Sequence, residues 1–190
     1  MNNTVRIIGG QWRRRLLKFP DSQGLRPTPD RVRETLFIWL GQTLDGQTCL
    51  DLFAGSGALG FEAASRGAAK VTLIEQAPAV HAALAANARL LGAENLELIR
   101  GDALKFAASA TAQGRRFDVI FVDPPFRQGW LERLRPLLPP LLTDTGALYL
   151  EAEQPLDTEA DWQGWEVIRH NKAGQVHCHL LRRTDPPASA

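Results

Sequence analysis

The stretch that decides the fold runs from Asp51 to Gly60 and reads Asp-Leu-Phe-Ala-Gly-Ser-Gly-Ala-Leu-Gly. It closes a strand-like apolar run at residues 48–53 and leads into a helical window. Gly55, Gly57 and Gly60 have the spacing Gly-x-Gly-x-x-Gly, and glycines placed between a strand and a helix permit a tight turn and close approach of the backbone to a ligand. The stretch therefore predicts a cofactor-binding turn in a nucleotide-binding fold.

Strand and helix patterns alternate on both sides of this turn. Further strand-like runs occupy residues 70–75, 96–101, 117–123, 147–152, 166–169 and 176–181, and helical windows fall near residues 58–66, 78–91, 103–110 and 130–142. Such alternation predicts parallel pairing in a doubly wound α/β sheet. A short polar segment with Gly174 joins the last two runs, so these are expected to form an antiparallel C-terminal hairpin.

Length and composition are those of an ordinary globular domain. The 190 residues fit one domain, and 44% hydrophobic residues suffice for a core. The N-terminus lacks an apolar signal region, and no run approaches the roughly 18 apolar residues of a membrane helix, so a cytoplasmic protein is expected. Cys49 and Cys178 lie in apolar strand-like runs, which predicts a buried, reduced pair.

Charge is distributed unevenly. Residues 1–37 carry eight Lys or Arg against three Asp or Glu, a net charge of +5, whereas the remaining residues sum to −4. A basic end on a mildly acidic body is typical of a surface that meets phosphate, although charge alone fits a solvated extension equally well. The residues expected to contact RNA are Arg6, Trp12, Arg13, Arg14, Arg15, Lys18, Arg26, Arg31 and Arg33. We accordingly predict a basic, RNA-facing extension at 1–40, a catalytic domain at 41–183 and a tail at 184–190.

A helix is expected to follow the basic segment. Thr28 has the right residue type for an N-cap, Pro29 suits the first helical position, and Asp30 favours the positive end of the helix. Spacing of the apolar residues predicts one buried face, made of Val32, Leu36, Trp39 and Leu40.

The glycine pattern alone does not identify the cofactor. A nicotinamide dinucleotide fold uses the same spacing with an acid about 20 residues further on, and Glu75 meets that condition, so it is expected to accept hydrogen bonds from ribose hydroxyls in either case. Asp51 favours a different cofactor. An acid inside a strand is costly unless it has a partner, and a cationic aminoacyl group supplies one. Asp102 lies at the end of the third strand-like run, residues 96–101, where it is either an ordinary helix cap or an adenine ligand.

Asp123-Pro124-Pro125-Phe126 ends the strand-like run at 117–123. An exocyclic amine is a poor nucleophile because its lone pair is delocalised into the ring. Asp123 and the carbonyl of Pro124 could accept both N–H bonds, which favours a pyramidal nitrogen aimed at a methyl donor. The prolines stiffen the turn, and Phe126 offers a face on which a base stacks. The second Asp-Pro-Pro, at residues 185–187, has neither a strand before it nor an aromatic residue after it, so we predict that it has no catalytic role.

From residue 1 to about Arg183, the chain resembles the bacterial RsmD-type methyltransferases. The resemblance rests on residues 6–10, 12–13, 25–28, 31–37, 51–57 and 123–126. It implies a class I methyltransferase fold, Rossmann-like, with a seven-stranded, mostly parallel sheet and an antiparallel C-terminal hairpin strand. It also implies S-adenosylmethionine as cofactor, bound by Asp51, Phe53, Ala54, Gly55, Ser56, Gly57, Glu75, Asp102 and Ala103, with Asp102 and Ala103 on the adenine.

The implied reaction is methylation of the N2 amine of a guanine in 16S rRNA, catalysed at Asp123, Pro124, Pro125 and Phe126. The implied partner is the assembled or partly assembled small ribosomal subunit. The protein is expected to act as a monomer and to need no metal ion. Two alternatives stay open. One is an amino-group methyltransferase acting on protein glutamine or DNA adenine, and the other is a non-catalytic RNA-binding assembly factor. His177 and His179 lack a third metal ligand in the sequence, and a structural role is expected for them.

Overall fold

The computed structural model describes residues 2–22, 25 and 28–184, so Arg26 and the second Asp-Pro-Pro lie outside the described residues. The chain forms two compact units, Met1–Ala103 and Leu104–Ala190. Their strands make a seven-stranded, mostly parallel sheet of order β5-β4-β3-β6-β7-β9-β8, which confirms the predicted fold class. Among the described residues, no helix is long and apolar enough to cross a membrane.

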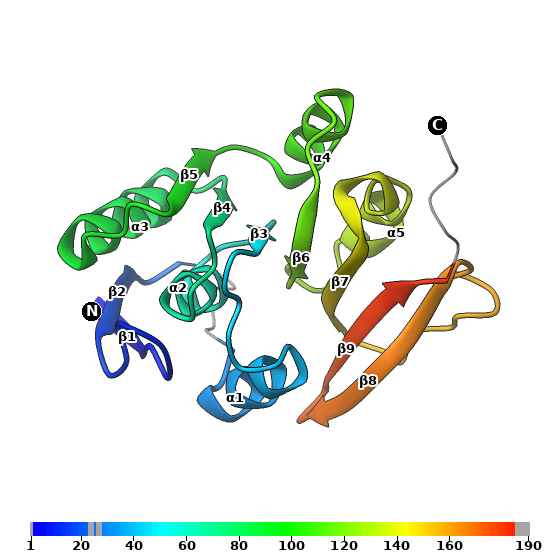
Figure 1. The fold of residues 1–190 in the computed structure, drawn as a ribbon, viewed down its shortest axis with the longest axis horizontal. Helices are drawn as coiled ribbons and strands as arrows, with labels where there is room; N and C mark the ends of the chain where they lie inside the picture. Colours follow the sequence, from blue (N-terminus) through cyan, green and yellow to red (C-terminus); the bar gives the residue numbers. More distant parts are fainter. Residues whose placement is uncertain (1, 23–24, 26–27, 185–190) are drawn as a thin grey trace. The chain divides into compact units, whose positions relative to one another are not determined.

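The first unit holds three parallel strands and the helices that connect them (Figure 1). The strands are β3 (Thr48–Asp51), β4 (Lys70–Glu75) and β5 (Leu96–Arg100), and the helices are α2 (Ala58–Ser65) and α3 (Pro78–Leu91). These elements begin and end within two residues of the predicted limits. Strands β3 and β4 are almost wholly buried, as expected of parallel strands covered by helices.

An N-terminal hairpin was missed by the sequence analysis. Strands β1 (Asn2–Arg6) and β2 (Leu16–Pro20) pair antiparallel. Val5, Leu17 and Phe19 are buried and alternate with exposed residues, an alternation typical of a half-buried strand. The buried amide of Asn87 on α3 accepts from the N–H of Lys18 at 3.1 Å and donates to its C=O at 2.8 Å. The basic segment is therefore a docked hairpin.

Helix α1 (Asp30–Trp39) begins one residue later than predicted. Pro29 is the N-cap, and the carbonyl of Thr28 accepts the Arg33 Nε–H at 3.2 Å. The predicted apolar face is also partly wrong. Val32 and Leu36 are buried as expected, but the other buried positions are Arg33 and Phe37, while Trp39 and Leu40 at the helix end are only half-buried.

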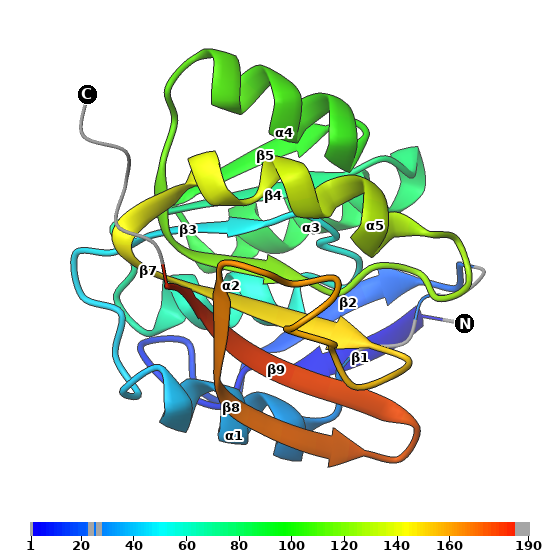
Figure 2. The ribbon, with the colours of Figure 1, turned by 90° about the vertical axis from the view of Figure 1, so that its right-hand side faces the viewer.

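Helix α4 (Ala103–Ala112) begins at the last residue of the first unit and continues in the second. The second unit also contains β6 (Phe117–Val122), α5 (Trp130–Leu134), β7 (Leu142–Ala152), β8 (Trp165–Ala173) and β9 (Val176–Arg183). Strands β6 and β7 are parallel, and β9 pairs antiparallel with both β7 and β8, which confirms the C-terminal hairpin (Figure 2). The predicted helix at 130–142 is wrong beyond Leu134. Pro136, Pro139 and Pro140 lack the backbone N–H that a helix needs, and two 3-10 turns replace it.

Both cysteines are buried and free, as predicted.

Candidate active site

The glycine turn follows β3 and leads into α2. Gly57 is the N-cap of α2 with φ of 80°, and its N–H donates to the C=O of Ala54 at 2.7 Å. A Cβ on Gly57 would lie 2.7 Å from both Phe61 and Leu84 side chains, and one on Gly60 would lie 2.6 Å from Leu73. The turn therefore needs glycine at 57 for conformation and space, and at 60 for packing of α2 against β4.

Asp51 lies beneath this turn and is 1% exposed. Its Oδ2 accepts the Gly60 N–H at 3.1 Å, whereas its Oδ1 has no hydrogen-bond partner in the described part of the chain. Burial raises the pKa of Asp51 to about 7, the nearby charge of Glu75 adds to the rise, and the N–H groups of Phe53 and Gly60 partly offset it. A buried acceptor without a donor fits a ligand that brings a cationic or N–H group.

Glu75 ends β4 and ties the turn in place. Its Oε2 accepts the Gly55 N–H at 3.0 Å, and its Oε1 accepts the Ala77 N–H at 2.7 Å. The side chain is half-buried, and each carboxylate oxygen keeps acceptor capacity for ligand hydroxyls. Within the same unit Phe53 and Asp102 are half-buried, whereas Ala54, Ser56 and Ala103 are buried. Asp102 directly precedes α4, so its side chain lies at a helix N-terminus.

In the second unit, Asp123 to Phe126 follow β6 as predicted. Asp123 is half-buried, Pro124 is buried, and Phe126 is 41% exposed. An exposed aromatic ring next to a half-buried carboxylate is a combination that suits a planar, amine-bearing ligand.

Arg33 does not belong to a surface that RNA could reach. It is fully buried, and its guanidinium contacts Glu62 at 3.4 Å and Asp30 at 2.6 Å and donates to the carbonyl of Arg6 at 2.8 Å. Glu62, also fully buried, accepts the N–H groups of Ile8 and Gly9 as well. The prediction that Arg33 binds RNA is corrected to a structural role, because the helical spacing that hides Arg33 was misjudged.

Among the other described residues predicted to bind RNA, the cations are exposed and Trp12 is half-buried. Arg13, Arg14 and Arg15 lie exposed on the loop between β1 and β2, and Arg6, Lys18 and Arg31 are exposed nearby in sequence. Trp12 is half-buried, and its backbone N–H donates to Ser65 Oγ at 2.9 Å. The arginine loop is thus held by α2 on its inner side and presents three cations outward.

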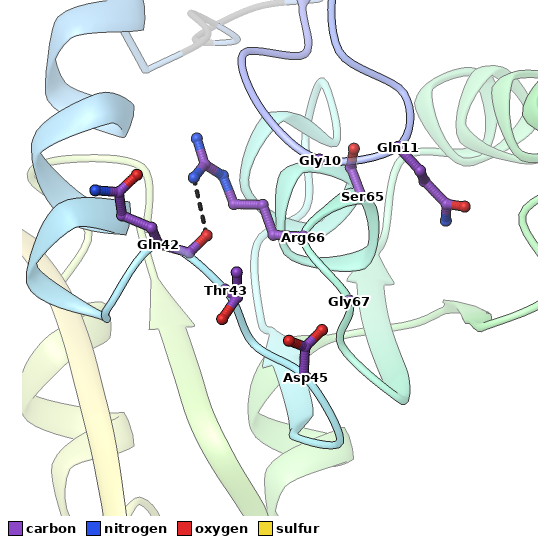
Figure 3. Close-up of a pocket in the computed structure, with 8 residues that line it drawn as sticks. All are labelled: Gly10, Gln11, Gln42, Thr43, Asp45, Ser65, Arg66 and Gly67. Atoms are coloured by element: carbon purple, nitrogen blue, oxygen red, sulfur yellow. Dashed lines mark hydrogen bonds between the residues drawn. The ribbon is translucent and has the colours of Figure 1, made fainter.

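A pocket of about 370 Å³ lies at the C-terminal end of α2 (Figure 3). Gly10, Gln11, Gln42, Thr43, Asp45, Ser65, Arg66 and Gly67 line it. Arg66 Nη1 donates across it to the carbonyl of Gln42 at 3.0 Å. Because the glycine turn is at the other end of α2, this hollow is not the predicted cofactor site.

Two groups in the second unit were missed by the sequence analysis. Glu151 on β7 is buried and bonded to the Tyr149 hydroxyl; an acid in the apolar run at 147–152 was the available signal. His170, on β8, stacks against His177 and His179 with ring centroids 5.3 and 4.6 Å away. Even so, no group of three or more His, Cys, Asp or Glu among the described residues could hold a metal ion.

The strand order and the glycine turn define the Rossmann-like fold of class I methyltransferases. Residues 5–182 match the family described as Conserved hypothetical protein 95, and the chain belongs to this family. This confirms the resemblance to RsmD-type methyltransferases.

Similar proteins cover nearly the whole chain. Ribosomal RNA small subunit methyltransferase D of Escherichia coli K12 is 47% identical over 94% of this chain and 90% of its own length. The protein of that name from Haemophilus influenzae is 44% identical, over 94% and 93%. A solved structure, "Putative methyltransferase yhhF from Escherichia coli", superposes with a TM-score of 0.83 at 44% identity, covering 95% of this chain and 98% of that one.

Proposed function

We propose that this protein is a cytoplasmic, S-adenosylmethionine-dependent methyltransferase that modifies the N2 amine of a guanine in 16S rRNA. The observation that carries the proposal is the 47% identity, across almost all of the chain, to a protein named for methylation of small-subunit ribosomal RNA. The choice of the guanine N2 amine rests on the chemistry of Asp123 to Phe126 and on the sequence resemblance. The same resemblance supplies the predicted position, guanine 966.

The first unit offers the features that this cofactor needs. When bound, S-adenosylmethionine supplies a methyl group on a positively charged sulfur. We assign the unpartnered Oδ1 of Asp51 to the cationic aminoacyl end of the cofactor and the half-buried carboxylate of Glu75 to its ribose hydroxyls. Phe53 to Gly57 would line its methionine part, and Asp102 and Ala103 its adenine. A methyltransferase described as complexed with SAH has the same fold at a TM-score of 0.68 and 17% identity.

The second unit would act on the amine. The Asp123 carboxylate and the Pro124 carbonyl accept the two N–H bonds of the amine, which frees the nitrogen lone pair for an in-line displacement. Asp123 or water would take the proton that the amine releases when it gains the methyl group. Phe126 stacks on the target base, worth roughly 1 to 3 kcal/mol.

RNA binding is assigned to the exposed cations of the N-terminal hairpin and its loop, with Arg31. Arg26 belongs to the same proposal by sequence alone. We propose that the protein binds as a monomer to the assembled or partly assembled small subunit.

The test is transfer of labelled methyl from S-adenosylmethionine to small subunits from cells lacking this protein, with free 16S RNA in parallel. We expect label on the subunit, as N2-methylguanosine at one site by mass spectrometry. Label on another base or on protein would contradict the proposed specificity, and no label on either substrate would favour a non-catalytic assembly factor.

A further inference from the structure

The second unit places another carboxylate beside Asp123. Phe121 of β6 pairs with Tyr149 of β7 in parallel register, and their rings meet edge to face with centroids 6.4 Å apart. Asp123 and Glu151 each come two residues later. Because side chains two residues apart share a strand face, and paired strands are about 4.8 Å apart, both carboxylates project to the same face of β6 and β7.

Cys178 on β9 gives independent support for this arrangement. It is the register partner of Glu151 across the antiparallel pair, and strands β6, β7 and β9 follow one another in the sheet (Figure 1). Burial raises the pKa of the Cys178 thiol to about 11, and the negative charges of Glu151 and Asp123 both contribute to the rise. The two carboxylates therefore lie near one thiol.

Glu151 is held as a hydrogen-bond acceptor. The Tyr149 hydroxyl donates to its Oε1 at 2.8 Å, and the two side chains are 0% and 6% exposed in this order. Burial and the charge of Glu151 raise the pKa of Tyr149 well above its usual range, so the hydroxyl keeps its proton. Burying a carboxylate in the mainly apolar end of β7, residues 147–152, lowers stability. Such a cost is typical of a residue retained for ligand binding.

Guanine and adenine are both purines with an exocyclic amine, but the ring nitrogen N1 beside that amine differs in its hydrogen-bonding character. Guanine presents its N2 amine next to N1–H, a second donor, whereas adenine presents its N6 amine next to N1, an acceptor. The Asp-Pro-Pro-Phe turn satisfies the amine of either base. Selection of guanine therefore needs an acceptor placed beside Asp123.

We propose, on the basis of the proposed function, that Glu151 is that acceptor: its carboxylate takes the N1–H of the target guanine while Asp123 takes an N2–H, and adenine is rejected because its N1 would face a negative charge. Tyr149 is a positioning residue that orients Glu151. A flipped base read along its Watson–Crick edge is the general form of such recognition.

The test compares two bases at the methylated position of reconstituted small subunits. One is guanine and the other is 2-aminopurine, which keeps the 2-amine but has an acceptor at N1. We expect kcat/KM of the unaltered protein to be about 10- to 100-fold higher for guanine, the range expected for recognition of one base edge. Glu151→Gln, whose amide is able to donate to N1, should lose activity on guanine and bring the ratio close to one.

Two further variants make the test specific. Tyr149→Phe removes only the hydroxyl and should lower the ratio part of the way. Cys178→Ser perturbs the same buried cluster and should leave the ratio unchanged. Circular dichroism checks folding, and if Glu151→Gln is unfolded, the ratio of Tyr149→Phe decides.

A folded Glu151→Gln with the original ratio would overturn the inference and leave the role of Asp123 standing. A Cys178→Ser variant with an equally lowered ratio would also overturn it, because general disturbance of the cluster would then explain the effect. Failure of the unaltered protein to methylate guanine would instead reject the proposed function, and this inference with it.

Discussion

At the scale of the residue, Asp51 is a buried acid whose Oδ1 has no hydrogen-bond partner among the described residues. Its pKa of about 7 lies above its ordinary 3.8, so folding favours the protonated form. This contribution to stability is fully present below pH 3.8 and is lost as pH rises through the folded pKa. We expect the cost of keeping Asp51 buried and ionised to be recovered when a cationic ligand binds.

Replacing Asp51 by Asn removes this titration. Between pH 4 and pH 8, the free energy of unfolding of the unaltered protein should fall relative to that of Asp51→Asn by roughly 2 to 4 kcal/mol. Urea denaturation at both pH values measures this. Calorimetry should also show weaker binding of S-adenosylmethionine to Asp51→Asn. Parallel pH profiles for the two proteins would contradict the assignment.

Asp123 is the residue on which the proposed chemistry depends most. Asp123→Ala should lower kcat by a factor equivalent to about 3 to 4 kcal/mol of transition-state stabilisation, as expected for removal of one preorganised polar partner. Single-turnover methylation of small subunits measures this. Asp118→Asn is the matched control, because Asp118 lies on the same strand and accepts from the Thr143 hydroxyl at 3.0 Å. Nearly normal turnover in Asp123→Ala would reject the mechanism.

At the scale of the element, the loop between β1 and β2 depends on one glycine. Gly10 has φ of 74°, and a Cβ there would lie 1.8 Å from the backbone carbonyl oxygen of Ser65 on α2. This loop carries Arg13, Arg14 and Arg15, so the fit of Gly10 against α2 fixes where these cations lie. The loop also bonds α2 through the N–H of Gln11 at 2.8 Å from the same oxygen.

Gly10→Ala should therefore lower the free energy of unfolding through the clash with Ser65 as well as through backbone strain. Gly46→Ala is the control, since Gly46 has φ of 75° with no atom within 4 Å of the added Cβ. We expect Gly46→Ala to lower the free energy of unfolding by about 1 to 2 kcal/mol, and Gly10→Ala to lower it by at least about 1 kcal/mol more. Urea denaturation measures both changes. Equal destabilisation by the two changes would show that the loop moves freely away from α2.

The β8–β9 hairpin contains a second pH-dependent group, of opposite sign to Asp51. Burial, together with the neighbouring His170 and His177, lowers the pKa of His179 to about 4. Burial and the charge of Lys172 also lower the pKa of His177. Because the unfolded chain protonates near pH 6.5, the folded protein should lose roughly 2 to 3 kcal/mol as pH falls from 6.5 to 4. The His179→Phe variant should lose less stability over this pH range, as measured by thermal melts. An unchanged acid dependence in that variant would exclude His179 as the cause.

At the scale of the whole molecule, charge is separated along the sequence, with +5 on residues 1–37 and −4 on the rest. Burial of Arg33 removes one cation from the basic surface, and the loop between β1 and β2 keeps the exposed Arg13, Arg14 and Arg15. This polarity should orient the protein on a polyanion and make binding depend on salt.

Replacing Arg13, Arg14 and Arg15 by Gln should weaken binding to small subunits. The slope of log K against log salt should fall by about 0.7 for each phosphate that the variant no longer neutralises. Filter binding at several salt concentrations measures the slope, and Arg89→Gln, an exposed change on α3, serves as control. An unchanged slope in the triple variant would remove this loop from the RNA interface.

From the sequence alone came the fold class, the glycine turn, the limits of β3, β4, β5, β6 and β9 to within two residues, and the placing of Asp51, Glu75 and Asp123 at strand ends. These features are local, because glycine spacing, alternation and strand ends follow from the chain's own periodicity. The docked N-terminal hairpin, the burial of Arg33 against Glu62 and the register of Glu151 beside Cys178 became evident only in the tertiary structure. These depend on partners distant in sequence or on neighbouring strands, and a pattern along one chain does not specify which distant residues will meet.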